Sequence, residues 1–149
     1  MEYRRANLND VDAFLQNRIE FVESIRNIAD ISTFEKETRA YLEAHIGTDD
    51  LLVFLALDNG EIIASCMACV FTTAPLPNYL SGKSAELLNV FTKREYRRRG
   101  LATKLLTLML GELKSAGVET VVLKYTEDGR TLYENLGFTL LKKQMQLCL

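Results

Sequence analysis

The 149-residue sequence has little histidine and cysteine, and each shortage argues against a class of functional site. Its single histidine, His45, argues against a histidine-dependent catalytic triad and against a metal site with several imidazole ligands. Its three cysteines are an odd number and do not form a disulfide framework. Cys66 and Cys69 have C-x-x-C spacing, but they lie in an apolar run that predicts a strand, where residues three apart point to opposite faces. We therefore expect Cys66, Cys69 and Cys148 to be small buried hydrophobic residues, and we expect no metal site.

Long apolar runs and an excess of positive charge are also absent. No run approaches the roughly 18 apolar residues of a membrane-spanning helix, and residues 1–5 lack the apolar core of a signal peptide. We therefore expect a cytoplasmic protein with no membrane partner. The formal net charge of −2 argues against a nucleic-acid partner, because such proteins carry a basic surface. The length, with 48% hydrophobic and 26% charged residues, predicts one compact domain over residues 1–149.

The charges are divided unevenly along the chain. Residues 1–83 carry 7 Lys and Arg against 13 Asp and Glu, a net −6, whereas residues 84–149 carry 11 against 7, a net +4. This division indicates that one part of the chain is suited to cations and the other to anions. A chance distribution of solvated surface charges is the alternative.

Hydrophobic periodicity and turn residues predict an alternating order of strands and helices. We expect a strand at 2–5, a helix capped by Asn9 or Asp10, a helix capped by Ser32 with Glu35, a hairpin of strands 51–57 and 61–72 around Asn59-Gly60, a loop at 73–83, a strand at 84–92, a helix at 99–116, a strand at 118–125, a helix at 128–136 and a last strand at 138–149. The hairpin indicates antiparallel pairing, and the later alternation indicates parallel pairing. The sequence therefore predicts an α/β fold with a mixed sheet and helices on both faces.

The segment from Arg97 to Ala102, with sequence RRRGLA, lies between a predicted strand and a predicted helix. Its glycine permits a tight turn and close approach of a ligand, and the first amides of the following helix have no partner within the helix. The helix dipole and the guanidinium groups favour an anion there. The segment has neither the Walker pattern nor G-x-G-x-x-G, and a solvated run of arginines is the alternative.

This segment resembles the acyl-CoA signature of the GNAT superfamily of N-acyltransferases, in which Arg97, Gly100 and Ala102 fill the characteristic positions. Residues 132–138 (LYENLGF) resemble the family's second motif, Tyr-x-x-x-Gly-Phe, and residues 86–96 resemble the strand that leads into the pyrophosphate loop. The resemblance is close over residues 84–140 and coarse over the rest. It implies one N-acetyltransferase domain with a twisted, mostly antiparallel mixed sheet whose central parallel strands splay apart.

The resemblance further implies that acetyl-CoA is the cosubstrate and binds along the strand and at the glycine turn. Many members have asparagine and alanine where this sequence has Thr126 and Gly129, and Thr126 would then be a weaker hydrogen-bonding substitute for the asparagine. The implied cofactor-binding residues are Phe91, Thr92, Arg97, Arg98, Arg99, Gly100, Leu101, Ala102, Thr103, Thr126 and Arg130.

Two catalytic residues are implied by the same resemblance. Glu86 lies on the strand that leads to the glycine turn, where several members have a general-base glutamate, and alternation places it on one face with Leu88, Val90 and Thr92. A solvent-exposed glutamate at the start of a strand is the alternative. Tyr133 belongs to the second motif, whose tyrosine approaches the CoA sulfur and protonates the departing thiolate. A core aromatic residue is the alternative there.

Together these features indicate an enzyme that acetylates a primary amine of a small molecule or peptide by direct attack on acetyl-CoA in a ternary complex. We expect no covalent acyl-enzyme, because the cysteines lie away from the motifs. A non-catalytic acyl-CoA-binding or regulatory domain is the alternative. Helices within residues 9–46 border the acceptor side in the family, and their excess of carboxylates predicts a cationic acceptor such as a polyamine or aminoglycoside. The motifs do not name the acceptor, and polyamines, aminoglycosides, amino acids and protein amines all stay open. We also expect a homodimer, formed through the last strand.

Overall fold

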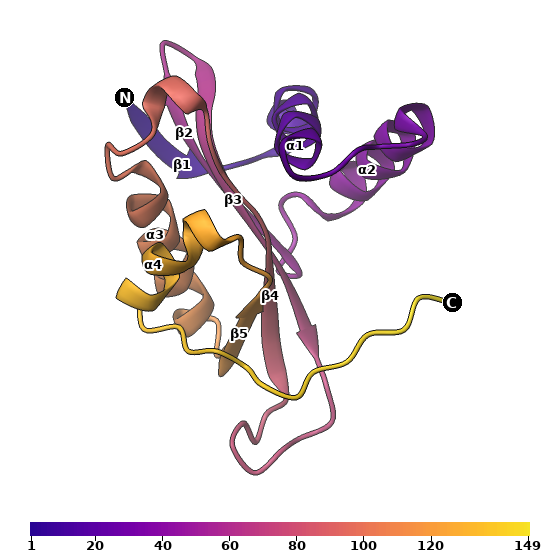
Figure 1. The fold of residues 1–149 in the computed structure, drawn as a ribbon, viewed down its shortest axis with the longest axis vertical. Helices are drawn as coiled ribbons and strands as arrows, with labels where there is room; N and C mark the ends of the chain where they lie inside the picture. The colour runs from indigo at the N-terminus through magenta and orange to yellow at the C-terminus, as the bar shows by residue number, and fades with distance from the viewer.

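The computed structural model describes residues 1–149 and consists of a five-stranded sheet between two pairs of helices (Figure 1). The strands are β1 (Glu2–Arg5), β2 (Leu51–Asp58), β3 (Glu61–Thr72), β4 (Lys83–Thr92) and β5 (Thr120–Leu123), in that order across the sheet. All neighbours pair antiparallel except β4 and β5, which are parallel. The helices are α1 (Val11–Ile25), α2 (Ile31–His45), α3 (Leu101–Ser115) and α4 (Glu127–Asn135), with short 3-10 turns η1 (Leu8–Asp10) and η2 (Arg94–Tyr96).

Figure 1 shows α1 and α2 on one face of the sheet and α3 and α4 on the other, so the predicted mixed sheet with helices on both faces is confirmed. Each face carries its own apolar core. Leu105, Leu106 and Met109 of α3 are fully buried against one face, and Phe14 and Leu15 of α1 are fully buried against the other. No helix is both long and apolar enough to cross a lipid bilayer.

Only part of β4 is paired with β5. Residues 84–87 of β4 pair with residues 120–123, and no strand pairs with residues 88–92 on that side. Along its other side, β4 pairs with β3 throughout, except that Leu88 is an extra residue between Leu87 and Asn89. This β-bulge bends the strand and changes which face the following side chains occupy. The unpaired side of β4 leaves backbone amides and carbonyls that can bind an extended ligand.

Residues 138–149 do not form the predicted last strand, and that prediction is wrong. Their alternating apolar residues, among them Met145 and Leu147, are exposed, and a cavity of about 790 Å³ lies between residues 136–144, β5 and α4. Alternation marks the two faces of a strand but does not supply a backbone partner, and this segment has no ladder with the four-residue β5. Cys148 is therefore exposed, against expectation, whereas Cys66 is buried and Cys69 is half-buried.

The helix caps agree with the prediction only in part: Asp10 is the N-cap residue of α1, one of the two predicted, although its side chain makes no hydrogen bond to that helix. Asp30, and not Ser32, caps α2, because its carboxylate accepts a hydrogen bond from the amide of Thr33 at 3.0 Å. Before α1, Asn7 accepts from the amide of Asn9 at 2.9 Å and so begins η1. Several polar residues close together in the sequence can each act as the N-cap of one helix, and the sequence alone does not show which of them does.

Asp10 connects this helix start to the edge strand β1. Its carboxylate accepts from the amide of Asn7 at 2.8 Å and forms a two-pronged pair with Arg4, with both oxygen–nitrogen distances at 2.7 Å. The hydrogen bonds from Arg4 hold the pKa of Asp10 below its ordinary value, although burial of the carboxyl opposes the shift. The charged form of Asp10 therefore stabilises the folded state.

We expect Asp10→Asn to lower the free energy of unfolding by about 1–3 kcal/mol at neutral pH, since it removes a charged pair and part of a cap. A lowered pKa in the folded state means that this contribution is full above the ordinary aspartate pKa and is lost as the pH falls through the folded value. Urea unfolding at pH 7 and pH 3 measures it.

Asp12→Asn is the matched control, because Asp12 pairs with Arg39 on the surface and its side chain is 83% exposed. Its expected effect is within about 0.5 kcal/mol. A loss at Asp10 that is equally large at pH 3, or no larger than the loss at Asp12, would contradict the assignment.

Candidate active site

The loop between β4 and α3 ends in a left-handed turn that faces open space. Arg98 has a φ of 62° and Gly100 a φ of 75°. No side chain caps α3, and the first intrahelical bond of the turn runs from the amide of Lys104 to the carbonyl of Gly100, so the amides of residues 101–103 stay free. A Cβ placed on Gly100 would meet no atom within 4 Å. Free amides, the positive end of a helix dipole and open space fit a phosphate group.

The three arginines of this loop have different contacts. Arg97 donates from Nε to the carbonyl of Thr92 at 3.1 Å, which ties the loop to the end of β4. Arg99 donates to a backbone carbonyl of η2 at 3.0 Å, and its guanidinium lies 5.1 Å from the centre of the Tyr96 ring. Arg98 is exposed and makes neither a hydrogen bond nor an ion pair within the chain. The loop is therefore supported by Arg97 and Arg99, and Arg98 is free to meet an anion.

Phe91 and Thr92 lie on the part of β4 that has no partner toward β5. Each pairs with β3 on the opposite side of the strand, with Phe91 opposite Ser65 and Thr92 opposite Ala64. The Phe91 side chain is buried and its ring centre lies 5.8 Å from that of Phe21 on α1. The free edge therefore presents the backbone of these two residues to a ligand, and this edge leads directly to the glycine turn.

Tyr133 is half-buried on α4, on the face of the sheet that α3 covers. Its ring meets Phe138 edge-on, with ring centres 5.8 Å apart. Burial raises the pKa of Tyr133 to about 12, and the nearby Cys66 thiol adds to the shift. Cys66 lies opposite Val90, which places Tyr133 beside the unpaired part of β4. The hydroxyl of Tyr133 has no hydrogen-bond partner within the chain, so it can donate to a ligand there.

Thr126 and Arg130, the other two expected cofactor-binding residues, lie at the start of α4. Thr126 is the N-cap residue, but its hydroxyl makes no capping hydrogen bond. A Cβ on Gly129 would lie 3.2 Å from Cε2 of Tyr133 and 3.5 Å from Oγ1 of Thr126, so these two side chains approach each other across the glycine. Arg130 instead pairs with Glu134 at 2.7 Å. The fold therefore brings Thr126 and Tyr133 together and directs Arg130 along its own helix.

Glu86 faces α1 and α2, and the prediction that it shares a face with Leu88, Val90 and Thr92 is wrong. The extra residue at Leu88 interrupts the alternation, so that Glu86 shares its face with Asn89 instead. Both lie opposite β3 residues that belong to the α1/α2 core, whereas Val90 packs on the α3 side. A bulge leaves no clear signal in the sequence, which is why alternation alone failed here.

Glu86 and Tyr133 therefore approach the unpaired part of β4 from opposite faces of the sheet and do not touch each other. Glu86 is half-buried, and its carboxylate makes no hydrogen bond or ion pair within the chain. A base on one face and a hydroxyl donor on the other suit a reaction in which the two substrates meet from the two sides of a gap in the sheet.

A chain of buried polar groups, which the sequence analysis did not identify, connects α1 to the same part of β4. Ser65 donates from its hydroxyl to Oδ1 of Asn17 at 2.6 Å, and Asn89 donates from Nδ2 to Ser65 at 2.9 Å. Arg18 donates from Nη1 to Oδ1 of Asn89 at 3.3 Å. Asn17, Ser65 and Asn89 occupy buried positions of their helix or strand, where apolar residues are usual, and a polar residue at such a position is the signal that could have revealed these three.

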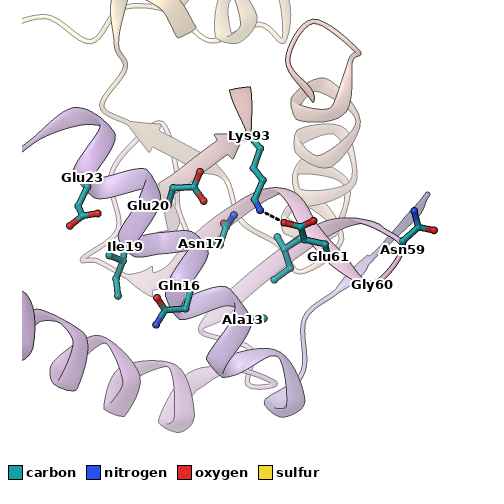
Figure 2. Close-up of a pocket in the computed structure, with 11 residues that line it drawn as sticks. Ala13, Gln16, Asn17, Ile19, Glu20, Glu23, Asn59, Gly60, Glu61 and Lys93 are labelled. Carbon is teal, nitrogen blue, oxygen red and sulfur yellow. Dashed lines mark hydrogen bonds and ion pairs between the residues drawn. The ribbon is translucent and has the colours of Figure 1, made fainter. Parts of the chain in front are cut away.

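The carboxylates of α1 line a different cavity, of about 720 Å³, between α1 and the turn that joins β2 to β3 (Figure 2). Glu20 and Glu23 face it, together with Glu61, which is paired with Lys93. Asn17 also lines it, and its Nδ2 has no hydrogen-bond partner. Much of the acidic surface of α1 is therefore directed toward the hairpin turn.

A glycine turn with free helix amides follows the partly unpaired strand, as the resemblance to the family predicts. Residues 19–138 match the acetyltransferase (GNAT) family, and the chain belongs to that family. No curated protein sequence matches significantly.

Solved structures share the fold. A predicted acetyltransferase from Clostridium acetobutylicum, solved with acetyl-CoA, is 24% identical with a TM-score of 0.86, and the match covers 99% of this chain and 95% of the other. A GCN5-related N-acetyltransferase from Ralstonia eutropha is 21% identical with a TM-score of 0.86, covering 99% and 97%. Glucosamine-6-phosphate N-acetyltransferase from Arabidopsis thaliana is 19% identical with a TM-score of 0.74, covering 99% of both chains.

We expect Gly100→Val to weaken acetyl-CoA binding by at least about tenfold, because a β-branched residue disfavours a positive φ and fills the space in front of the free amides. Arg98→Ala should weaken it only about two- to threefold, since an exposed arginine contributes a screened charge. Calorimetry on folded protein measures both affinities. Equal affinity in the wild type and Gly100→Val would contradict the assignment of the CoA pyrophosphate to this turn.

Proposed function

We propose that residues 1–149 form one N-acetyltransferase domain that transfers an acetyl group from acetyl-CoA to a primary amine of a small molecule or peptide. The observation that carries the proposal is the unpaired part of β4, which ends at a glycine turn with free amides. Backbone groups around Phe91 and Thr92 would hold the pantetheine arm, and the amides of residues 101–103 would hold the pyrophosphate. Acetyl-CoA would supply the activated carbonyl.

The residues around this edge have chemically distinct roles in a direct transfer. As the amine nitrogen bonds to the carbonyl carbon and the carbon–sulfur bond breaks, the Glu86 carboxylate accepts the proton that the amine loses. On the other face, the Tyr133 hydroxyl donates to the departing sulfur. The amide product keeps the acetyl group, and CoA leaves as a thiolate that takes a proton from solvent, while Glu86 returns its proton to solvent, so the step needs no other reactant.

Tyr133 acts in this proposal mainly as a hydrogen-bond donor. With a pKa of about 12 it stays protonated throughout the ordinary working range. A phenol of that pKa is roughly a thousandfold less acidic than a thiol, so complete proton transfer to the thiolate is uphill. A neutral donor beside a developing negative charge still stabilises it, most strongly where water is excluded.

We expect Tyr133→Phe to lower kcat by roughly ten- to a thousandfold with acetyl-CoA affinity nearly unchanged, because a donor to the leaving group acts in the transition state. Because the pKa of Tyr133 is about 12, the wild-type rate should show no loss from its ionisation up to about pH 10. Release of free thiol measures kcat. Tyr3→Phe, on the opposite edge of the sheet, is the matched control, and an unaltered kcat in Tyr133→Phe would leave Tyr133 a structural residue.

Glu86→Gln should lower kcat/KM most at the acidic end of the pH range, where the amine is hardest to deprotonate and a base contributes most. The pH profile of the variant, measured with saturating acetyl-CoA, checks this expectation. A profile that only shifts downward without changing shape would show that solvent or another group is the base.

A screen of amines for release of free thiol tests the function as a whole. Release with an acceptor supports the enzyme, whereas acetyl-CoA binding without release for any amine supports a non-catalytic acyl-CoA-binding domain. The homodimer stays a prediction, and residues 138–149 offer no formed strand through which two copies would pair.

A further inference from the structure

Arg18 is an exception among the arginines of this protein. Five arginines are half-buried, and four of them lie within 4.0 Å of a carboxylate: Arg4 with Asp10, Arg5 with Glu112, Arg39 with Asp12 and Arg130 with Glu134. Arg18 has no carboxylate within that distance, and its single hydrogen bond goes to the neutral amide of Asn89. Removal of a cation from water without an anion is unfavourable, and burial accordingly lowers the pKa of Arg18.

Three further buried polar residues hold this guanidinium in place. Asn17, Ser65 and Asn89 are each at most 4% exposed. Because Nδ2 of Asn89 donates to Ser65, the carbonyl oxygen of Asn89 is fixed toward Arg18. A buried polar chain of this kind adds little net stability compared with apolar packing, but it fixes the position of the groups it contains. The hydrogen-bond chain therefore fixes the position of the Arg18 guanidinium, and no carboxylate neutralises its charge.

The surroundings of Arg18 place it on the acceptor side of the proposed reaction. Tyr41 and Cys69 lie close enough to Arg18 to affect its charge, and the Tyr41 hydroxyl lies 3.1 Å from the Cys69 sulfur. Cys69 lies opposite Glu86 across the β3–β4 ladder, and Asn89 follows Glu86 past the bulge on the same face. Arg18 and Glu86 therefore occupy one face of β4, and Tyr41, which is 38% exposed, leaves this region open to solvent.

We propose that Arg18 binds the carboxylate of the acceptor, and that the acceptor is an amino acid whose amine lies at Glu86. This inference rests on the proposed function, because it names the substrate class of the same site. One nitrogen of the guanidinium is engaged by Asn89, which leaves the edge formed by Nε and Nη2 for a two-pronged contact with a planar carboxylate. A zwitterion complements a carboxylate and a guanidinium on one face, whereas a polycation would meet the unneutralised charge of Arg18.

This assignment reverses the expectation of a cationic acceptor drawn from the acidic N-terminal part. Asp10 and Asp12 are neutralised by arginines, Asp30 caps a helix, and Glu20 and Glu23 face the cavity near the β2–β3 turn. Arg18 is the charged residue of α1 that contacts Asn89, on the face of β4 that carries Glu86.

The test compares the twenty standard L-amino acids with their carboxamides, with spermidine and with phosphoethanolamine, using thermal stabilisation and release of free thiol. For the preferred amino acid, we expect kcat/KM to exceed that of its carboxamide by about 10- to 100-fold in the wild type, mainly through KM. In Arg18→Met, this ratio should fall to within about threefold, since the charge-assisted contact is gone. Stabilisation by the free amino acid should disappear in parallel.

Three controls separate binding from folding and from turnover. Arg26→Met removes an equal charge from the exposed end of α1 and should keep the carboxylate preference. Unchanged acetyl-CoA affinity shows that Arg18→Met is folded. Where it is not, Arg18→Lys carries the test, with a reduced preference expected because an ammonium cannot make the two-pronged contact.

The outcomes distinguish this inference from the proposed function. Stabilisation by free amino acids that depends on Arg18, without release of thiol, would support the inference and contradict the enzyme. Turnover with a preference for carboxamides, spermidine or phosphoethanolamine would support the enzyme and overturn the inference. A carboxylate preference that survives in Arg18→Met, or no stabilisation and no turnover with any amino acid, would also overturn it.

Discussion

The end of pairing between β4 and β5 at Leu87 is the constraint on which the site depends. Backbone amides and carbonyls inside a sheet are normally paired, and an unpaired buried group is costly. Five residues of β4 lack a partner on one side and run directly into the glycine turn before α3. The cost falls when water or an extended ligand satisfies these groups. A continuous sheet at this position would be more stable and would have no place to bind a ligand chain.

The bulge at Leu88 determines which side chains reach this opening. If residues 86–89 alternated regularly, with no bulge, Glu86 and Asn89 would lie three positions apart on opposite faces of the sheet. With it, Glu86 and Asn89 both face α1, and Asn89 can hold Arg18. The same irregularity leaves Val90 packed on the α3 side, near the position where Tyr133 stands. Because of this one inserted residue, Glu86 and Arg18 lie on the α1 face of the sheet, and the Tyr133 hydroxyl lies on the α3 face.

Local sequence signals predicted the elements whose geometry is set by a few neighbouring residues. Asn59 and Gly60 both take positive φ values in the tight β2–β3 turn, as their residue types require, and Gly100 takes a positive φ before α3. Features that depend on distant partners were not predictable in this way. Residues 138–149 alternate like a strand but have no strand beside them, and the face of Glu86 depends on a bulge that pairing with β3 creates. The motif residues were found by resemblance, whereas Arg18 belongs to no motif, and the resemblance of residues 86–96 gave Asn89 no role.

The N-terminal helices show why a summed charge is a weak guide to a ligand. A field over a surface depends on which charges remain unpaired and where they point, and short ion pairs cancel at a distance. Residues 1–83 carry a net −6, yet the pairs of Asp10 with Arg4 and Asp12 with Arg39 contribute little field beyond their own neighbourhood. On the face of Glu86, the guanidinium of Arg18 has no carboxylate partner and is held by Asn89. Because a half-buried charge is screened less than an exposed one, the proposed contact between Arg18 and the acceptor depends on this guanidinium and its position rather than on the summed charge of the N-terminal part.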